Sequence, residues 1–237
     1  MEQQQTWRRE LPNYKQVAPE IEDLPFQARE AINVLRGNIQ LSGANLKVIA
    51  ITSAVANEGK SSIAFRLTKS LAGLKKRTLY LDCDIRNSVT MSRYGMNGQV
   101  QGLTEYLCGA AAMNDIVYRT PDKYMDVILT GAVAPNPSEL VSGKLFTLLL
   151  DEMRKRYDYI IVDTPPINPV IDGTMIAKRC DGTVMVIESG QTDRMQAVRA
   201  KRQLEYAGIK LLGAVLNKVG AAKKGYGYGY GYGYGYG

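Results

Sequence analysis

The sequence contains no histidine in its 237 residues and only three cysteines, Cys83, Cys108 and Cys180, which are far apart. The absence of histidine excludes serine–histidine and cysteine–histidine catalysis and histidine-ligated metal sites. With an odd number of cysteines and no CxxC pair, neither a disulfide framework nor a zinc site is expected. Any metal must be held by oxygen ligands, which favours magnesium.

Long apolar segments are also missing. The opening MEQQQTWRRE has no apolar core of the kind that a signal peptide needs. The longest apolar runs, VIAITSAVA and LFTLLL, fall well short of the roughly 20 residues that a membrane-spanning helix requires. We therefore expect a soluble protein of the reducing cytosol that can still dock on a membrane protein.

Basic residues outnumber acidic ones, with 30 Lys and Arg against 23 Asp and Glu and a net charge of +7. This excess suggests an acidic partner, which can be nucleic acid, anionic lipid or nucleotide phosphate. The hydrophobic fraction of 45% is ordinary for a globular protein, and the length allows one domain with a sizeable core.

Three segments divide the chain. Residues 1–24 are polar and contain Pro12 and Pro19, so they predict an extended N-terminal arm. Residues 25–220 predict one folded domain, beginning with an amphipathic helix from Phe26 to Ile39. Residues 221–237 predict a flexible Gly-Tyr tail, because a glycine-rich chain cannot bury enough surface to fold.

Apolar strands alternate with helical patterns through the domain. The predicted strands are 46–54, 77–84, 126–131, 157–166, 182–189 and 210–219, and the predicted helices between them are 60–74, 138–155, 170–179 and 192–207. Such alternation predicts an α/β sandwich around a mainly parallel sheet with helices on both faces. Ligands of these sheets bind at the carboxyl ends of the strands.

A phosphate-binding loop follows the first predicted strand. TSAVANEGKSS fits the pattern G-x-x-x-x-G-K-[ST], with Ala54 in place of the first glycine. The backbone N–H groups of the loop and the helix N-terminus wrap phosphates, Lys60 neutralises the β and γ phosphates, and Ser61 ligates magnesium. The alternative is an incidental strand–turn–helix with a lysine. The predicted nucleotide-binding residues of this loop are Ala54, Asn57, Glu58, Gly59, Lys60, Ser61 and Ser62.

Two later strands end in aspartates. LYLDCDIR carries Asp82 and Asp84, which project from the same face of a strand because they are two apart. YIIVDTPP ends in Asp163, which resembles the aspartate of a Walker B motif. Together with Lys60, these residues predict the catalytic machinery of a P-loop NTPase, with Ser61, Asp82, Asp84 and Asp163 as the magnesium ligands. We expect Asp82 to lie closest to the incoming hydroxyl and the other two acids to serve the metal.

The combination of ANEGKSS, LYLDCDIRNS, IIVDTPP and a C-terminal tyrosine cluster resembles the bacterial tyrosine kinases. EAINVLRGNI is similar to their E-x-x-R-x-x-R-x-N oligomerisation helix, with Asn33 where the family usually has arginine, and APNPSEL is similar to a turn that precedes a helix. The resemblance covers roughly residues 24–220 and the tail. It implies an ATP- and magnesium-dependent protein-tyrosine kinase, of the Gram-positive type that has no membrane segment of its own.

The same resemblance implies partners and further roles. Glu30, Arg36 and Asn38 are expected to join subunits into a ring, such as an octamer, and Asn217 is a candidate adenine contact. A solvated helix face and an ordinary loop asparagine are the respective alternatives. A membrane adaptor of capsular or exopolysaccharide synthesis is expected to bind the kinase at the inner face of the membrane. A cognate tyrosine phosphatase is a further expected partner, and nucleic acid is not.

The tail supplies the expected phosphoacceptors, which are Tyr226, Tyr228, Tyr230, Tyr232, Tyr234 and Tyr236. At about 3.3 Å per residue, residues 218–236 extend on the order of 60 Å, enough to reach the site of a neighbouring subunit. Phosphorylation adds about −1.5 to −2 charges at each tyrosine, which would make tails near a common axis repel. The alternative is an adhesive low-complexity tail without a role in catalysis.

Two other functions fit parts of the pattern. Positioning ATPases of the division-site or partition type share the predicted fold, but they carry a signature lysine five residues before the loop lysine, where this chain has Val55. A scaffold that only binds nucleotide is the other alternative. It is disfavoured because Lys60 and the three aspartates are all present.

Overall fold

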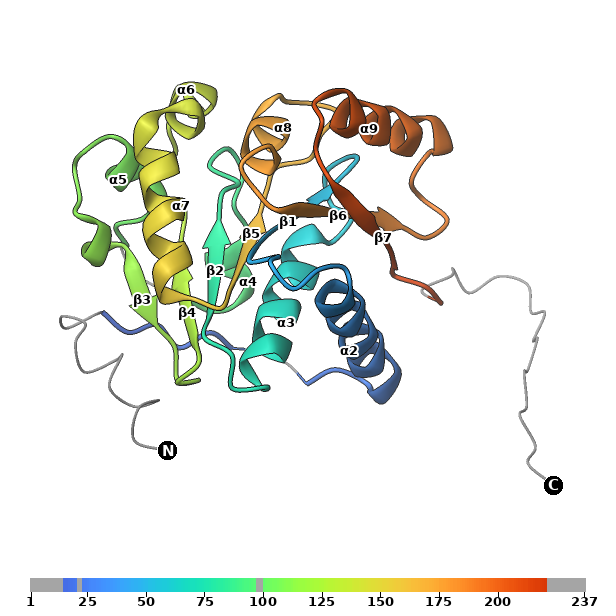
Figure 1. Cartoon of the computed structure of the whole chain (residues 1–237), viewed down its shortest axis with the longest axis horizontal. Coiled ribbons are helices and arrows are strands. Elements are labelled where there is room, and N and C mark those ends of the chain that lie inside the picture. The colour runs from blue at the N-terminus through green and yellow to red at the C-terminus, as the bar shows by residue number, and fades with distance from the viewer. Residues whose placement is uncertain (1–14, 21–22, 97–99, 221–237) are drawn as a thin grey trace.

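The computed structural model describes residues 15–20, 23–96 and 100–220, and its centre is a twisted seven-stranded sheet (Figure 1). The strand order is β3-β4-β2-β5-β1-β6-β7. Every neighbouring pair is parallel except β3 and β4, which are antiparallel. The predicted, mainly parallel α/β sandwich is therefore confirmed. The strands are β1 (Val48–Ser53), β2 (Thr78–Asp82), β3 (Val117–Arg119), β4 (Met125–Ile128), β5 (Tyr159–Asp163), β6 (Gly182–Glu188) and β7 (Leu211–Asn217).

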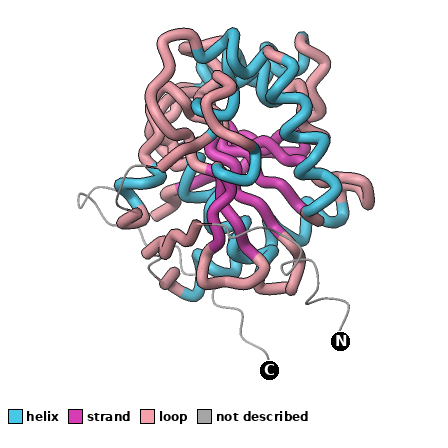
Figure 2. Tube along the Cα trace, turned by 90° about the vertical axis from the view of Figure 1, so that its left-hand side faces the viewer, coloured by secondary structure: helices cyan, strands magenta, loops and turns pink. Residues whose placement is uncertain are grey.

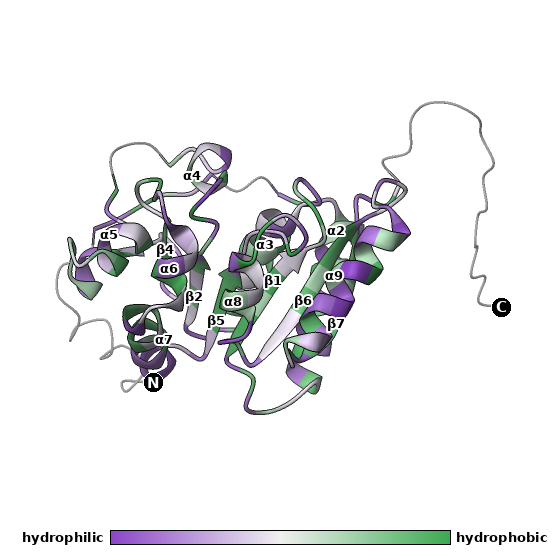
Figure 3. Ribbon diagram, turned by 90° about the horizontal axis from the view of Figure 1, so that it is seen from above, coloured by the Kyte–Doolittle hydropathy of each residue, from purple (hydrophilic) through white to green (hydrophobic). Residues whose placement is uncertain are grey.

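Helices cover both faces of the sheet (Figures 1 and 2). The first set, on the face of α3, comprises α2 (Phe26–Leu41), α3 (Lys60–Ala72) and the short α4 (Thr90–Arg93). The second set comprises α5 (Leu103–Leu107), α6 (Pro137–Ser142), α7 (Lys144–Arg156), α8 (Asp172–Ala177) and α9 (Arg194–Tyr206), and a 3₁₀ turn lies at Met113–Asp115. In Figure 3, α9 shows hydrophilic and hydrophobic bands, as expected for a helix packed on one side.

The alternation of side chains along each strand produces a core on either side of the sheet. On β1, Ile49 and Ile51 pack with α2 and α3, whereas Val48 belongs to the core beneath α7. All six β1 residues are buried because helices cover both faces of the sheet; the first four are apolar, and the polar Thr52 and Ser53 lie at the end of the strand. This rigid layer fixes the strand ends that carry the polar side chains described below.

Two local features differ from the sequence prediction. The predicted helix 138–155 is two helices, α6 and α7, because Gly143 between them has an extended backbone conformation. The edge strand β3 and the short helices α4 and α5 carry too few residues for a periodic pattern and were not predicted. Among the described residues no helix is long and apolar enough to cross a membrane.

Part of the predicted N-terminal arm runs beside the folded domain. Gln16 forms a parallel bridge with Arg119 of β3, and the Val17 N–H donates to the Arg119 carbonyl at 3.0 Å. The Glu20 N–H donates to the Tyr94 carbonyl at 2.8 Å. These contacts extend the sheet edge next to β3 and tie the arm to the segment that follows α4.

Candidate active site

The loop between β1 and α3 has the backbone conformation that the phosphate-binding pattern requires. Gly59 immediately precedes α3 and has a φ of 93°, and Asn57 has a φ of 68°. A Cβ atom at Gly59 would lie 2.2 Å from Nδ2 of Asn217. Glycine is therefore required here both by the left-handed backbone and by the close approach of a neighbouring side chain. The start of α3, where backbone N–H groups have no partner within the helix, borders the same cavity as this loop.

Two side chains hold the loop from behind. The Glu58 carboxylate accepts from the Val55 N–H at 2.8 Å and from the hydroxyl of Thr192, and Glu58 is buried. Asn217, at the end of β7, donates from Nδ2 to the Glu58 carbonyl at 2.9 Å. Because these contacts join the loop to the turn after β6 and to the end of β7, its shape depends on segments more than a hundred residues away.

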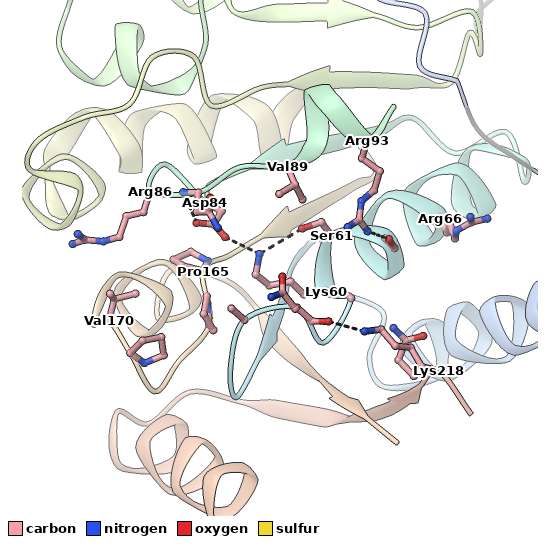
Figure 4. A pocket seen from close by; sticks show the side chains of 18 residues that line it. Lys60, Ser61, Arg66, Asp84, Arg86, Val89, Arg93, Pro165, Val170 and Lys218 are labelled. Carbon is pink, nitrogen blue, oxygen red and sulfur yellow. Dashed lines mark hydrogen bonds and ion pairs between the residues drawn. The ribbon is translucent and has the colours of Figure 1, made fainter. Parts of the chain in front are cut away.

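Lys60 lies at the centre of the charged groups (Figure 4). Its Nζ is 2.7 Å from Oδ2 of Asp84 and 3.7 Å from Oδ1 of Asp163. Burial alone would lower the pKa of Lys60, but Asp163 and Asp84 outweigh it, so the pKa is raised. The ammonium group therefore stays charged at neutral pH and compensates the carboxylates around it.

Asp82 and Asp163 lie on adjacent strands at the same level, paired in register between β2 and β5. Asp82 accepts from the Ser88 hydroxyl at 2.6 Å and from the Asp84 N–H at 3.1 Å. Burial, with the Asp163 charge adding to it, raises the pKa of Asp82 to about 7. Burial also raises the pKa of Asp163, although Lys60 opposes this shift.

Asp163 receives one direct hydrogen bond from a neighbouring strand. The Tyr80 hydroxyl donates to Oδ2 at 3.0 Å and also lies 2.9 Å from the Thr90 hydroxyl. Oδ1 is buried and has no hydrogen-bond partner within the described part of the chain. Such an oxygen is costly to leave unpaired, so it marks a place where a cation or a water molecule fits.

A cavity of about 560 Å³ opens over the loop. Its floor is the loop and the start of α3, and its walls come from the segments after β2, β5 and β7. The residues that line it are Ala56, Asn57, Gly59, Lys60, Ser61, Ser62, Arg66, Asp84, Arg86, Asn87, Val89, Arg93, Pro165, Pro166, Pro169, Val170, Asn217 and Lys218. Five cationic side chains against one carboxylate make this a cavity for an anion such as a nucleotide polyphosphate.

An ion pair fixes one wall of this cavity. Arg86 Nε donates to Oδ2 of Asp172 at 2.5 Å, and the Ser138 hydroxyl donates to Oδ1 at 2.5 Å. Asp172 is 2% exposed, whereas the Arg86 side chain is 42% exposed and faces the cavity. The pair thus connects the segment after β2 to α6 and α8.

The structure brings most of the predicted site residues together, but not all in the predicted manner. Asn57, Gly59, Lys60, Ser61, Ser62, Asp84 and Asn217 line the cavity, whereas Ala54, Glu58, Asp82 and Asp163 do not. The Ala54 side chain is buried in the core, and the Glu58 carboxylate points into the loop. Asp84, not Asp82, is the aspartate of this pair that faces the cavity, so the expectation that Asp82 lies closest to the incoming hydroxyl is not supported by this arrangement.

Several cavity residues were missed by sequence reasoning. Arg86 lies two residues after Asp84 in DCDIR, and that proximity could have suggested it. Arg93 bonds the Ser62 hydroxyl and Lys218 bonds the Asn57 carbonyl, but both depend on contacts between distant segments. No local pattern marks them.

The residues expected to join subunits lie on α2, away from this cavity. Arg36 donates to the backbone carbonyl of Ser70 at 3.0 Å and to its hydroxyl at 2.8 Å, so it ties α2 to α3 within the chain. Glu30 accepts from the amide of Asn33 at 2.9 Å, and Asn38 is exposed. The predicted tyrosines 226–236 lie outside the described residues.

The oxygen donors near the loop fit magnesium, but not as three carboxylates around one ion. In the ranges that the structure describes, no three acidic, thiol or imidazole side chains gather as a metal cluster. Asp84 is engaged by Lys60 and Asp82 by Ser88, so three carboxylates around one ion is not the arrangement seen. Magnesium prefers one or two carboxylates completed by water and substrate phosphates. The unpaired Oδ1 of Asp163 and the Ser61 hydroxyl fit that smaller demand.

Comparison with known proteins agrees with this geometry. Residues 46–193, more than half of the chain, match the AAA domain family. The tyrosine-protein kinase CpsD of Streptococcus agalactiae is 42% identical over 193 residues, which cover 81% of this chain and 84% of the relative. The tyrosine-protein kinase YwqD of Bacillus subtilis is 37% identical, over 79% of this chain and 80% of its own length. This chain belongs to the bacterial tyrosine kinases.

Solved structures of tyrosine kinases are also similar to this chain. The kinase domain of the Escherichia coli tyrosine kinase ETK superposes on this bacterial tyrosine kinase with a TM-score of 0.78 at 29% identity, covering 89% of this chain and 87% of that one. The chimerical protein CapA2B2 gives a TM-score of 0.78 at 27% identity, covering 91% and 99%. The enzyme is a P-loop protein-tyrosine kinase, so the predicted family and activity are confirmed.

The positioning ATPases share the fold of this chain but are less similar to it in sequence. The cell division ATPase MinD of Pyrococcus furiosus superposes with a TM-score of 0.64 at 21% identity, covering 74% of this chain and 73% of that one, and shares the fold alone. The Streptococcus agalactiae kinase is 42% identical to this chain, twice the identity of MinD. The positioning ATPase and the inactive scaffold are therefore both set aside.

Proposed function

We propose that this kinase transfers the γ-phosphoryl group of ATP to tyrosines of its own C-terminal tail, Tyr226, Tyr228, Tyr230, Tyr232, Tyr234 and Tyr236, in a neighbouring subunit. One observation carries the proposal: Lys60 and Asp84 form a 2.7 Å ion pair at the floor of a cationic cavity, beside a loop built to wrap phosphates. The similarity to tyrosine kinases of about the same length supports tyrosine as the acceptor.

In the proposed reaction the phenolic oxygen attacks the γ phosphorus, the bond from that phosphorus to the β,γ-bridging oxygen breaks, and ADP leaves. Backbone N–H groups of the loop at Gly59 and Lys60 bind the phosphates, and Lys60 Nζ stabilises the negative charge that develops on them. Bound magnesium would supply charge neutralisation on the β and γ phosphates. Ser61 and Asp163 would hold the ion, and Asp82 would add negative charge beside Asp163 from the adjacent strand.

The phenolic proton needs an acceptor because the pKa of an unperturbed tyrosine is about 10. Asp84 faces the cavity, so we propose that it orients the acceptor hydroxyl and takes its proton once Lys60 has turned to the phosphates. Asp82 is fully buried, so in this proposal it does not touch the acceptor hydroxyl and affects the reaction only through its neighbour Asp163. Asp84→Asn should then lower kcat more than Asp82→Asn, with both variants still binding ADP. The reverse order would restore Asp82 to the role that the sequence suggested.

The tail assignment is tested by mixing two complementary proteins, one without kinase activity and one without the tail. A Lys60→Met protein that keeps its tail is incubated with active protein that lacks residues 225–237. We expect phosphotyrosine on the Lys60→Met partner and none on Lys60→Met protein alone. Label confined to active full-length chains, with a rate independent of dilution, would show that each subunit modifies itself.

We also propose that the kinase works as an oligomer. Glu30, Arg36 and Asn38 on α2 would join subunits into a ring, and the charge added to the tails would loosen it at low salt more than at high salt. A membrane adaptor would hold the ring at the inner face of the membrane, where cycling controls capsular or exopolysaccharide synthesis, and a phosphatase would reset it. Sedimentation of the unphosphorylated and phosphorylated forms tests the assembly step: a monomer at every concentration in the unphosphorylated form would refute it.

A further inference from the structure

Tyr80 is a polar group that the proposed reaction does not use. It lies on β2, two residues before Asp82, and is completely buried. Its ring packs edge-on against Phe65 of α3, with centroids 5.0 Å apart, and Phe65 in turn stacks on Tyr94 at 4.0 Å. A buried phenol hydroxyl needs a partner, and this one reaches the strand end that carries Asp163.

The hydrogen bonds around Tyr80 have one consistent direction. Asp163 can only accept while it is ionised, so the Tyr80 hydroxyl donates to Oδ2, at 3.0 Å. The hydroxyl has no second proton, so at 2.9 Å the Thr90 hydroxyl must donate to Tyr80. The chain Thr90 to Tyr80 to Asp163 therefore connects α4, β2 and β5.

This series of hydrogen bonds determines which oxygen of the Asp163 carboxylate faces the site. Oδ2 accepts the hydrogen bond from Tyr80. Oδ1 points toward Lys60, 3.7 Å from Nζ, and accepts no hydrogen bond from any described residue. The carboxylate is 1% exposed, so water from bulk cannot take over the role of the phenol. A rotation of the Asp163 carboxylate would break the bond from Tyr80.

We infer that Tyr80 is a positioning residue that holds Asp163 with Oδ1 presented to the cation of the nucleotide complex. The inference rests on the proposed function, in which Asp163 holds magnesium. Tyr80 touches neither nucleotide nor acceptor and acts only through Asp163. Partners in this outer layer of a metal site typically change metal affinity or activity by about 10- to 100-fold when they are removed.

The chain offers a matched control at another strand end. Tyr157 is also buried, and its hydroxyl donates to Oδ2 of the buried Asp126 at 2.8 Å. Neither residue lines the cavity. Tyr80→Phe and Tyr157→Phe therefore remove the same group, from the same kind of contact, at two places in one fold.

The experiment measures ADP binding to full-length protein as a function of magnesium concentration, alongside kcat and KM for ATP. In Tyr80→Phe we expect the magnesium concentration for half-maximal gain in ADP affinity to rise about tenfold, with magnesium-free ADP affinity unchanged. We expect kcat to fall and KM, measured at saturating magnesium, to stay within about twofold. Tyr157→Phe should leave all four quantities unchanged. A Tyr80→Phe titration that matches Tyr157→Phe would overturn the inference.

Two further variants separate the possible failures. Asp163→Asn should abolish the magnesium effect on ADP binding; if it does and Tyr80→Phe changes nothing, the proposed function stands and the inference falls. If Asp163→Asn itself changes nothing, the assignment of Asp163 fails and the inference falls with it. Should Tyr80→Phe not fold, Thr90→Val removes the donor to Tyr80, and a magnesium midpoint equal to that of the wild type would refute the connection.

Discussion

Asp82 and Asp163 are register partners on the adjacent strands β2 and β5, and both are buried. Two such groups cannot both ionise without a compensating cation, and Lys60 is the cation that the fold provides. The protonation of this pair therefore links stability, pH and nucleotide binding.

Stability of the nucleotide-free protein should fall as pH rises through the weakly acidic range. Burial raises the pKa of Asp82 to about 7 in the folded protein. In the unfolded chain the pKa of an aspartate is about 3.9. At a pH between the unfolded and the folded pKa, the folded state therefore binds more protons than the unfolded state. The free energy of unfolding should then decrease from about pH 5 to about pH 7 and level off above it.

No histidine titrates between pH 5 and pH 7 in this protein, because the sequence contains none. Thermal unfolding at fixed ionic strength checks the prediction, and Asp82→Asn should flatten the slope. Added magnesium and ADP should also flatten it, since a bound cation favours the ionised carboxylates. A melting temperature that increases from about pH 5 to about pH 7 in the free protein would contradict the assignment.

Asn217→Ala should weaken nucleotide binding without unfolding the protein. Its amide donates to the Glu58 carbonyl at 2.9 Å and packs over Gly59, so the substitution releases the loop. Loss of one such hydrogen bond corresponds to about 1 kcal/mol, or roughly fivefold in ADP affinity. Isothermal titration measures it, with Gln203→Ala as the control, because that amide bonds Thr174 away from the cavity. Equal affinities in the two variants would show that Asn217 does not support the loop.

Arg86→Met should destabilise the protein more than Arg77→Met does. Arg86 pairs with the buried Asp172, which the substitution would leave with Ser138 alone, at a cost of about 1–3 kcal/mol. Arg77 pairs with Asp158 at 3.1 Å, but both side chains are about a third exposed, so its ion pair contributes less, about 0–1 kcal/mol. Urea unfolding compares the two variants. The reverse ranking would mean that Asp172 does not depend on Arg86.

Arg36→Met should lower stability as well as any tendency to assemble. Its guanidinium makes two hydrogen bonds to Ser70 of α3, so about 1 kcal/mol of unfolding free energy is expected to be lost within one subunit. Glu30→Gln, at an exposed position, should leave stability unchanged and is the control. Urea unfolding at low concentration and sedimentation separate the two effects. Unchanged stability in Arg36→Met would assign Arg36 entirely to contacts between subunits.

The sequence by itself determined the class of fold and the location of the site. Continuous apolar strands alternating with helices can only be buried as a parallel sheet covered on both faces, and parallel strands bring their carboxyl ends to one edge. The loop at Gly59 and Lys60 and the aspartates at positions 82, 84 and 163 stand at those ends, so their proximity followed from local pattern alone.

Only the tertiary structure decided how each of these groups is held. Asp84 faces the cavity and Asp82 does not, because Ser88 and the backbone turn after β2 engage Asp82. The bonds from Tyr80 to Asp163, from Arg86 to Asp172 and from Asn217 to Glu58 join residues 83, 86 and 159 positions apart. Such contacts arise from the packing of separate strands and helices, and no periodicity within a short segment encodes them.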